Sequence, residues 1–195
     1  MHQPDVPPLH IDLPQPVLQT RRLRLRALRE ADAEAVQRYC SDREIASTTL
    51  HIPHPYPAGS AISWIRTHPE AYASGQSATW VMDLPGSGLV GVIGLGLQPA
   101  HRRAELGYWV GRPHWGQGYA SEAARGVVAC AFEGFGMYRV HAHHLSRNPA
   151  SGAVLRRAGM RHEGTLRGHI LKWGVFEDVE TYGVLRDDFT AGAQG

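Results

Sequence analysis

An α/β fold with the element order βααβββαβαββ is predicted by three features of the sequence. Apolar and polar side chains alternate in short segments that are typical of strands, and apolar side chains recur at helical spacing in longer segments. A loop with two glycines joins one such strand to the longest helical segment. Because the chain has 195 residues and is 43% hydrophobic, we expect a single domain over residues 19–190.

The elements follow from their local patterns. Residues 22–28 alternate arginine with leucine or alanine and predict a strand with one solvated face. The prolines of residues 51–57 keep that segment out of regular structure. Residues 1–18 are expected to form an irregular, proline-rich leader, and residues 191–195 a flexible tail. Helices are further predicted over residues 30–40, 59–73 and 149–158, and strands over residues 77–83, 89–97, 103–110, 138–144, 160–168 and 176–185.

The loop at residues 115–120 reads Trp-Gly-Gln-Gly-Tyr-Ala and leads into a helix predicted over residues 119–135. Two glycines let the backbone turn its N–H groups toward a ligand, and a helix start carries partial positive charge, so the loop is typical of a phosphate site. It lacks the Lys-Ser/Thr pair of a nucleoside-triphosphate loop and the third glycine of a dinucleotide loop. We therefore expect the pyrophosphate of another cofactor here.

Charge, cysteine and hydropathy patterns restrict the class of protein. The net charge of +2 is too small to indicate nucleic acid as the main partner; Arg22, Arg24 and Arg26 form either a solvated strand face or a contact with nucleic acid or the ribosome. Cys40 and Cys130 lack the spacing of a redox or metal motif and are expected to be reduced, structural thiols. No apolar stretch is long enough for a membrane span, so we expect a cytoplasmic protein.

Several short motifs lie within residues 17–189: Leu106-Gly-Tyr-Trp109, Trp115-Gly-Gln-Gly118-Tyr-Ala120, Asn148-Pro-Ala-Ser151 and Glu163-Gly164. In this combination the chain resembles the GNAT superfamily of N-acetyltransferases, and within it the Rim-type branch, the ribosomal-protein N-terminal acetyltransferases and their relatives. The superfamily signature is Gln/Arg-x-x-Gly-x-Gly/Ala. Tryptophan at its first position departs from that signature but leaves the backbone cradle intact.

The resemblance implies a mixed, mostly antiparallel sheet that splays between its fourth and fifth strands and holds acetyl-coenzyme A (acetyl-CoA) in the opening. The backbone of Tyr108, Trp109 and Val110 would pair with the pantetheine arm, as a strand does at an open sheet edge. Asn148 and Ser151 would lie near the thioester. The residues implied for the pyrophosphate are the loop amides of Gln117, Gly118, Tyr119 and Ala120. Trp115 and Gly116 of the same signature are implied for cofactor binding, and Arg156 for the adenosine phosphate.

Acetyl transfer needs a base for the amine and a proton for the departing thiolate. By resemblance to Rim-type enzymes, Glu163 is the first candidate for the base; Glu105, on an alternating strand, is the second, and either can also be an ordinary surface carboxylate. Ser151 is the candidate acid, although a serine at a helix start often satisfies backbone donors instead. Cys40 and Cys130 show no sign of activation, so direct attack by the amine is preferred.

The resemblance to Rim-type enzymes implies a protein N-terminal α-amine as the acceptor. Such an amine, with a pKa of about 8, also has more free base at neutral pH than a lysine with a pKa of about 10.4. A small amine, such as an antibiotic, a polyamine or an amino acid, is the alternative; a non-catalytic acyl-CoA sensor or binding module is the alternative outside enzymes. His51, His54 and Tyr56 are expected to border the acceptor site. His141 and His143 have no further ligand beside them, so no metal is expected. The sequence does not decide whether the protein forms a homodimer.

Overall fold

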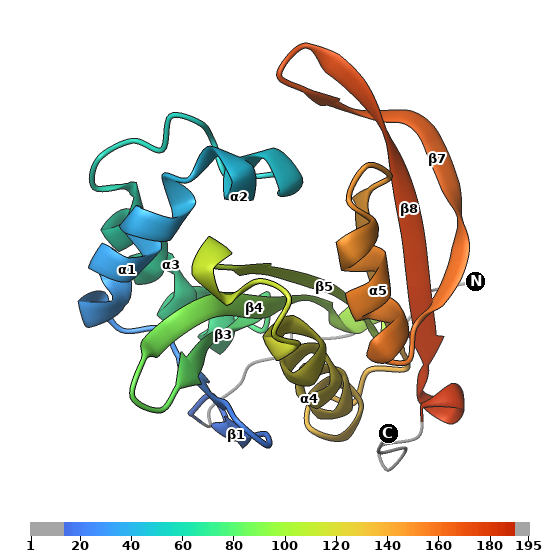
Figure 1. Cartoon of the computed structure of the whole chain (residues 1–195). Helices are drawn as coiled ribbons and strands as arrows, with labels where there is room; N and C mark the ends of the chain where they lie inside the picture. Colours follow the sequence, from blue (N-terminus) through green and yellow to red (C-terminus); the bar gives the residue numbers. More distant parts are fainter. Residues whose placement is uncertain (1–13, 190–195) are drawn as a thin grey trace.

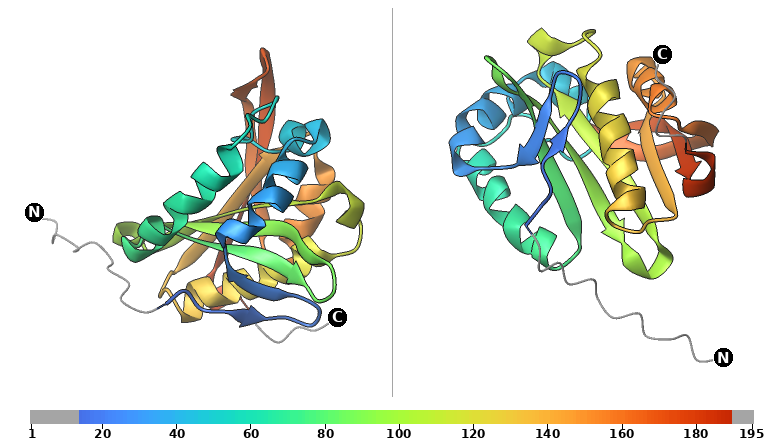
Figure 2. Two further views of the ribbon diagram at one scale, coloured as in Figure 1. Left: turned by 90° about the vertical axis from the view of Figure 1, so that its left-hand side faces the viewer. Right: turned by 90° about the horizontal axis from the view of Figure 1, so that it is seen from below.

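The computed structural model of the chain describes residues 14–189. This part of the chain forms an eight-stranded sheet with helices on both faces (Figures 1 and 2). The strands are β1 (Leu18–Gln19), β2 (Arg24–Ala27), β3 (Ser77–Leu84), β4 (Gly88–Gln98), β5 (Arg103–Val110), β6 (Arg139–Leu145), β7 (Arg161–Lys172) and β8 (Val175–Leu185). The α-helices are α1 (Ala33–Cys40), α2 (Arg43–Thr48), α3 (Ser60–Ala73), α4 (Tyr119–Glu133) and α5 (Pro149–Arg157).

The strand order is β1-β2-β3-β4-β5-β6-β8-β7, and all neighbours are antiparallel except β5 and β6. The parallel register of β5 and β6 ends where Glu105 pairs with His141, although β5 continues to Val110 and β6 to Leu145. The two strands therefore separate beyond Glu105. This confirms the predicted mixed, mostly antiparallel sheet, whose opening lies between the fourth and fifth strands of the predicted order.

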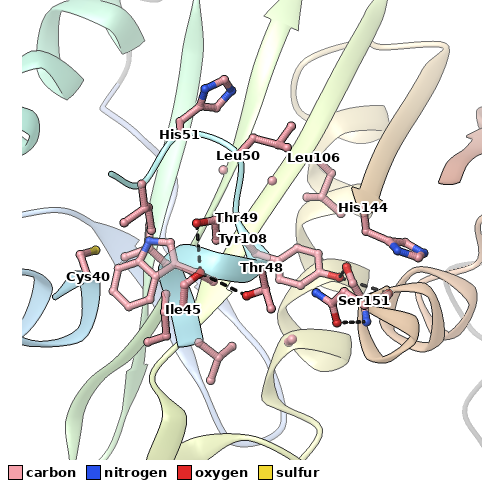
Figure 3. A pocket seen from close by; sticks show the side chains of 18 of the residues that line it. Cys40, Ile45, Thr48, Thr49, Leu50, His51, Leu106, Tyr108, His144 and Ser151 are labelled. Atoms are coloured by element: carbon pink, nitrogen blue, oxygen red, sulfur yellow. Dashed lines mark hydrogen bonds between the residues drawn. The ribbon is translucent and has the colours of Figure 1, made fainter. Parts of the chain in front are cut away.

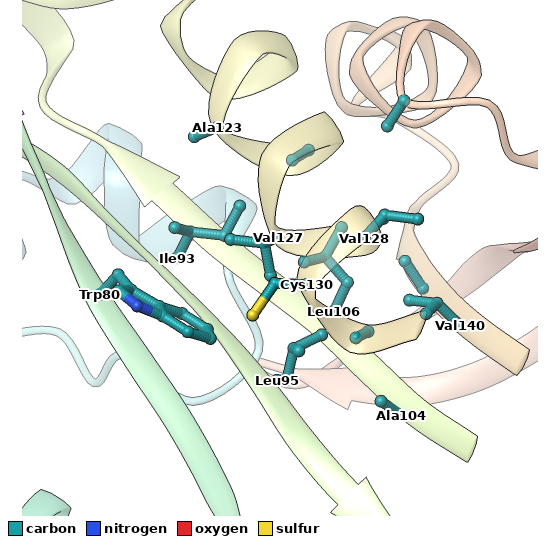
Figure 4. Close-up of a cluster of buried hydrophobic side chains, with 14 of the residues drawn as sticks. Trp80, Ile93, Leu95, Ala104, Leu106, Ala123, Val127, Val128, Cys130 and Val140 are labelled. Carbon is teal, nitrogen blue, oxygen red and sulfur yellow. The ribbon is translucent and has the colours of Figure 1, made fainter. Parts of the chain in front are cut away.

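The sheet separates two hydrophobic clusters because side chains alternate between its faces. Trp80 and Ile93 pack in the cluster that includes Val127 of α4 (Figure 4). The neighbouring residues Val81 and Val92 pack in the cluster that includes α1, α2 and α3. An opening between β5 and β6 thus connects the side of α4 with the side of α1 to α3.

The first helical region differs from its prediction. Residues 30–32 form a 3-10 turn, so α1 begins only at Ala33. The helix α2 was not predicted, although Asp42 gives it a start signal: the Asp42 side chain accepts a hydrogen bond from Glu44 N (2.9 Å). This helix leads into the residues that border the opening in the sheet.

The β7–β8 hairpin is longer than predicted. Its two strands meet at a two-residue turn, Trp173 and Gly174, and both residues have positive φ (51° and 84°). Such a turn suits the twist of a hairpin, and Gly174 was its signal in the sequence. Leu171 and Phe176 beside the turn are exposed.

The N-terminal residues contact the sheet. Trp80 Nε1 donates to Pro16 O (2.8 Å), and β1 already begins at Leu18. Residues 14–18 of the predicted leader therefore pack against the fold, whereas residues 1–13 and the predicted tail, 191–195, lie outside the described residues. Between residues 14 and 189, no helix combines the length and the apolar character needed to cross a membrane.

Two of the three arginines of the first predicted strand are paired, and Arg24 is exposed. Arg26 pairs with Asp32 (2.8 Å) and Asp83 (2.9 Å), and its side chain is mostly buried. Arg22 pairs with Glu122 on α4 (2.7 Å). Because these two cations already have carboxylate partners, the geometry does not support the nucleic-acid or ribosome contact that the alternating arginines left open.

Candidate active site

A cavity of about 810 Å³ lies where β5 and β6 separate (Figure 3). Its lining comes from both sides of the sheet, since Thr48 ends α2 and Thr49 follows it, whereas Tyr108 reaches toward Ser151 on α5 (Figure 3). We distinguish an acceptor half, lined by residues 48–53 with Thr79, Gly94, Gly96, Glu105 and Gly107, from a cofactor half, lined by Tyr108, Val110, Trp115, Gly116, Asn148 and Ser151.

The end of β5 offers backbone groups to the cofactor half. Gly111 N donates to β4 (2.8 Å), whereas Val110 O accepts from Trp115 Nε1 (2.6 Å) on the other side. Because the direction of these groups alternates along a strand, the N–H and C=O groups of Tyr108 and Val110 face the opening. Those of Trp109 face β4, so this residue lines the cavity with its side chain and not with the backbone contact that the resemblance implied.

The loop before α4 has the conformation of an anion site. Gly116 and Gly118 have positive φ (74° and 81°), and a Cβ at Gly116 would meet no atom within 4 Å. The free N–H groups at the start of α4 suit a pyrophosphate. Arg22, just before β2, stabilises this loop by donating hydrogen bonds to Gln117 O (2.9 Å) and to the Glu122 carboxylate (2.7 Å). The sequence pattern alone did not reveal this role of Arg22.

A second cavity of about 1180 Å³ adjoins the loop on its other side. Arg22, Arg125 and Arg157 line it, and guanidinium groups suit phosphate. Arg156, the residue implied for the adenosine phosphate, is absent from this lining and donates to Tyr182 Oη instead (2.9 Å). Consecutive residues of a helix point about 100° apart, which is why Arg157 lies where Arg156 was expected.

The Ser151 hydroxyl faces Tyr108, and another residue caps α5. The Asn148 side chain accepts from Ser151 N (3.4 Å), so the cap of α5 is made by Asn148. The Ser151 hydroxyl is left to Tyr108, whose hydroxyl lies 2.7 Å from Ser151 Oγ. Burial raises the pKa of Tyr108 to about 12, so its hydroxyl stays protonated at neutral pH and can donate.

Glu105 reaches the acceptor half from the point where β5 and β6 separate. It is the only carboxylate among the described residues that line the cavity. Glu105 Oε1 lies 3.2 Å from His143 Nδ1, and Glu105 Oε2 lies 3.9 Å from His141 Nε2. Burial lowers the pKa of His141, which favours its neutral form beside this carboxylate. The histidine pair predicted on one strand face thus lies next to Glu105.

Glu163 lies apart from the cavity. Arg139 binds both of its carboxylate oxygens, at 2.7 and 2.5 Å, and Glu163 is absent from the cavity lining. Hydrogen bonds from Arg139 lower the pKa of Glu163. A carboxylate that is paired with an arginine and has a lowered pKa accepts a proton poorly at neutral pH. The geometry therefore disfavours Glu163, the first candidate for the base, and favours Glu105.

Three glycines form the floor of the acceptor half. Gly94 pairs with Gly107 across β4 and β5, and Gly96 pairs with Glu105. A Cβ at Gly96 or Gly107 would meet nothing within 4 Å. Glycine inside a strand weakens the sheet and commonly marks the close approach of a ligand. These glycines were not identified as site residues, although glycine at alternate positions of a strand pattern was their signal.

Residues 48–53 form the wall of the acceptor half opposite this floor. His51 and Tyr56, predicted to border the acceptor, line the cavity. His54 does not, because its ring lies against Trp173 at the tip of the β7–β8 hairpin (6.1 Å between ring centroids).

Comparison with known proteins agrees with this geometry. Residues 22–161 match the family described as acetyltransferase (GNAT) domain. The chain is 32% identical over 173 residues to the uncharacterized N-acetyltransferase YoaA of Bacillus subtilis, covering 88% of this chain and 97% of that protein.

Two further similarities concern Rim-type proteins. The ribosomal-protein-serine acetyltransferase of Escherichia coli is 30% identical over 100 residues, which is 51% of this chain and 56% of that protein. The solved structure of Mycobacterium smegmatis RimJ in complex with CoA-disulfide superimposes with a TM-score of 0.82 at 23% identity, over 93% of this chain and 92% of that one. The chain belongs to the GNAT family of acyl-CoA-dependent N-acetyltransferases, and its relatives include Rim-type enzymes.

Proposed function

We propose that this protein transfers the acetyl group of acetyl-CoA to a protein N-terminal α-amine by direct attack. The observation that carries the proposal is that Glu105 is the only carboxylate among the described lining residues, and that it lies where the two halves of the cavity meet. One carboxylate suffices to take one proton from one amine. An acceptor with several positive charges would need further acidic partners.

The cofactor half provides the contacts for acetyl-CoA. The open edge of Tyr108 and Val110 would pair with the pantetheine amides, and the loop at Gly116 and Gly118 would hold the pyrophosphate. Arg157 replaces Arg156 as the residue proposed for the adenosine phosphate, because it lines the adjoining cavity. These contacts fix the thioester near Ser151.

In the proposed reaction, the amine nitrogen bonds to the thioester carbonyl carbon and the carbon–sulfur bond breaks. Glu105, directly or through one water, takes the proton that the amine loses. The Ser151 hydroxyl gives a proton to the departing thiolate, and the Tyr108 hydroxyl, 2.7 Å away, stabilises Ser151 Oγ by donating a hydrogen bond. Afterwards the proton on Glu105 returns to solvent and Ser151 regains one from solvent, so the reaction is balanced. The N–H of Val110, which faces the opening, is the proposed donor to the carbonyl oxygen as it gains negative charge.

The surroundings of the acceptor half favour an amine at the end of a neutral chain. The glycine floor leaves room for an extended chain, and the histidines beside Glu105 add no negative charge. The E. coli relative is a ribosomal-protein-serine acetyltransferase, which supports an α-amine of a protein. A small uncharged amine is the second candidate, since the same floor also accommodates it.

Acetyl mass shifts test the proposal. The protein is incubated with acetyl-CoA and a mixture of Ser- and Ala-initiated peptides, polyamines and aminoglycosides. We expect modification confined to peptide α-amines. Modification confined to small amines would identify the second candidate, a small uncharged amine, as the acceptor. The absence of any shift, with acetyl-CoA binding confirmed by calorimetry, would contradict the enzyme and favour an acyl-CoA sensor.

A further inference from the structure

The acceptor wall, residues 48–53, is held by a segment far away in the sequence. Beyond Thr48, at the end of α2, this wall has no helix or strand of its own. Irregular segments with few contacts are the most mobile parts of a fold. The residues that fasten this wall therefore decide the shape of the acceptor half.

Locally, the hydroxyls of Thr48 and Thr49 donate to Ile45 O (3.1 Å each) within α2. The first long-range fastening is Lys172, the only lysine of the chain. It ends β7, and its Nζ donates to Thr49 O (2.5 Å) across 123 positions of sequence. Its side chain is buried, with 7% of the residue exposed, and the ammonium group also lies 4.9 Å from the centre of the Trp173 ring. No carboxylate among residues 14–189 forms an ion pair with it. A buried charge is costly unless it is well hydrogen-bonded, so the Thr49 carbonyl is its essential partner.

A second link reinforces the first. Arg147, after β6, donates to Ser47 O (2.6 Å) and to Glu177 of β8 (2.8 Å). It therefore ties the end of α2 to the same hairpin that carries Lys172. Figure 1 shows the tip of β7 and β8 on the side of α2, away from α4. Within residues 14–189, no side-chain hydrogen bond or ion pair joins this hairpin to the loop before α4, so the hairpin acts on the acceptor half.

We propose that Lys172 is a positioning residue for the amine acceptor: it holds residues 48–53 in the place where they form the acceptor wall. This inference rests on the proposed function for the identity of the acceptor, but the fastening itself does not. Loss of the ammonium group loosens the wall. The acceptor then binds more weakly, while acetyl-CoA, which the cofactor half binds, is unaffected.

Steady-state kinetics with acetyl-CoA and a serine-initiated peptide test the proposal in Lys172→Met and Lys172→Arg. For Lys172→Met we expect the KM of the peptide to rise about tenfold, as loss of a charged hydrogen bond allows, with kcat and the KM of acetyl-CoA nearly unchanged. Lys172→Arg, which keeps a cationic donor, should restore much of the peptide KM. Leu171→Ser is the matched control, because Leu171 is the adjacent, exposed residue of β7 and should behave as the natural protein.

Hydrogen exchange gives a readout that needs no acceptor. In Lys172→Met, the amides of residues 48–53 should exchange faster, and those of residues 116–120 should not. Unchanged exchange in residues 48–53, or an equal rise in both KM values, would overturn the inference. If the natural protein acetylates no peptide but the exchange result holds, the proposed acceptor is wrong and the positioning role of Lys172 stands.

Discussion

The two halves of the cavity are built in different ways. The cofactor half consists mainly of backbone within residues 108–120, namely the edge of β5, two glycines with positive φ and the start of α4, to which Asn148 and Ser151 add their side chains. The acceptor half consists of side chains and of glycines without side chains from the end of α2, the segment after it, β3, β4 and β5, and the β7–β8 hairpin holds its wall. A ligand common to a family can be bound by backbone groups, whereas a particular acceptor requires particular side chains.

Ser151, at the junction with the cofactor half, gives the largest expected effect. Ser151→Ala removes the proton donor for the thiolate and should lower kcat by about two orders of magnitude. The affinity for acetyl-CoA, measured by calorimetry, should change little because Asn148 caps α5 without the Ser151 hydroxyl. A kcat that stays within about twofold of the natural value would show that Ser151 only packs against Tyr108.

Gly107 tests the acceptor half alone. Gly107→Val places a side chain in the open floor, and overpacking by about 1–3 kcal/mol corresponds to a rise of about fivefold or more in the KM of the acceptor. The fold should tolerate valine, which suits a strand. Gly91→Ala is the contrasting variant, because its Cβ would lie 2.5 Å from Trp109 O and should lower the melting temperature instead. Equal KM values for Gly107→Val and the natural protein would show that the acceptor binds elsewhere.

Adjacent arginines of α5 test the cofactor half. Arg157→Ala removes a guanidinium group from the second cavity and should weaken acetyl-CoA binding about tenfold. Arg156→Ala should leave this affinity nearly unchanged, since Arg156 binds Tyr182. Calorimetric titration with acetyl-CoA and with 3′-dephospho-CoA, which lacks the adenosine 3′-phosphate, separates a contact of Arg157 with that 3′-phosphate from a contact with the pyrophosphate. The reverse order of effects would restore Arg156 to its predicted role.

The smallest effect is expected at the brace of the phosphate loop, the ion pair of Arg22 with Glu122. Burial opposes the charge of Glu122, but hydrogen bonds from Thr20 and Arg22 outweigh burial and lower the pKa of Glu122. Because the pKa is lowered in the folded state, the brace is complete above the ordinary glutamate value of about 4.3 and is lost as the pH falls through the folded value. Glu122→Gln should weaken acetyl-CoA binding about threefold at pH 7.

The pH series separates this brace from other groups. In both proteins, acetyl-CoA affinity should change at about pH 6, where the adenosine phosphate takes up a proton. In the natural protein it should weaken again below the ordinary glutamate range. The Glu122→Gln variant should lack that second step. A second step of the same size in both proteins would assign it to a different carboxylate.

The sequence predicted the cofactor half much better than the acceptor half. Backbone demands are visible locally, so Gly116 and Gly118 identified the loop and a Rim-type resemblance placed Ser151. The proposed role of Arg157 depends on the rotation of α5 about its axis. A shift of one residue in a predicted helix changes which side chain faces the cavity, and the sequence does not fix a helix to within one residue. The pairing of Glu163 with Arg139 depends on the approach of β7, β8 and β6, and no local pattern reports such contacts.

Most of the acceptor half could not be predicted, because it too depends on contacts between segments that are distant in the sequence. Lys172 and Thr49 meet only because the β7–β8 hairpin extends to its Trp173–Gly174 turn. Gly94 and Gly107 become one floor only through the register of β4 with β5. Glu105 was recognised from alternation alone, but its advantage over Glu163 required the point at which β5 and β6 separate.

The most direct test of the account compares Glu105→Gln with Glu163→Gln in single-turnover acetyl transfer to a serine-initiated peptide, with acetyl-CoA affinity measured beside it. Glu105→Gln should lower the rate by about two orders of magnitude or more, as loss of a general base does, and leave acetyl-CoA affinity unchanged. Glu163→Gln should keep most of the rate. Loss of turnover in Glu163→Gln, with Glu105→Gln still active, would contradict the assignment of the base to the acceptor half.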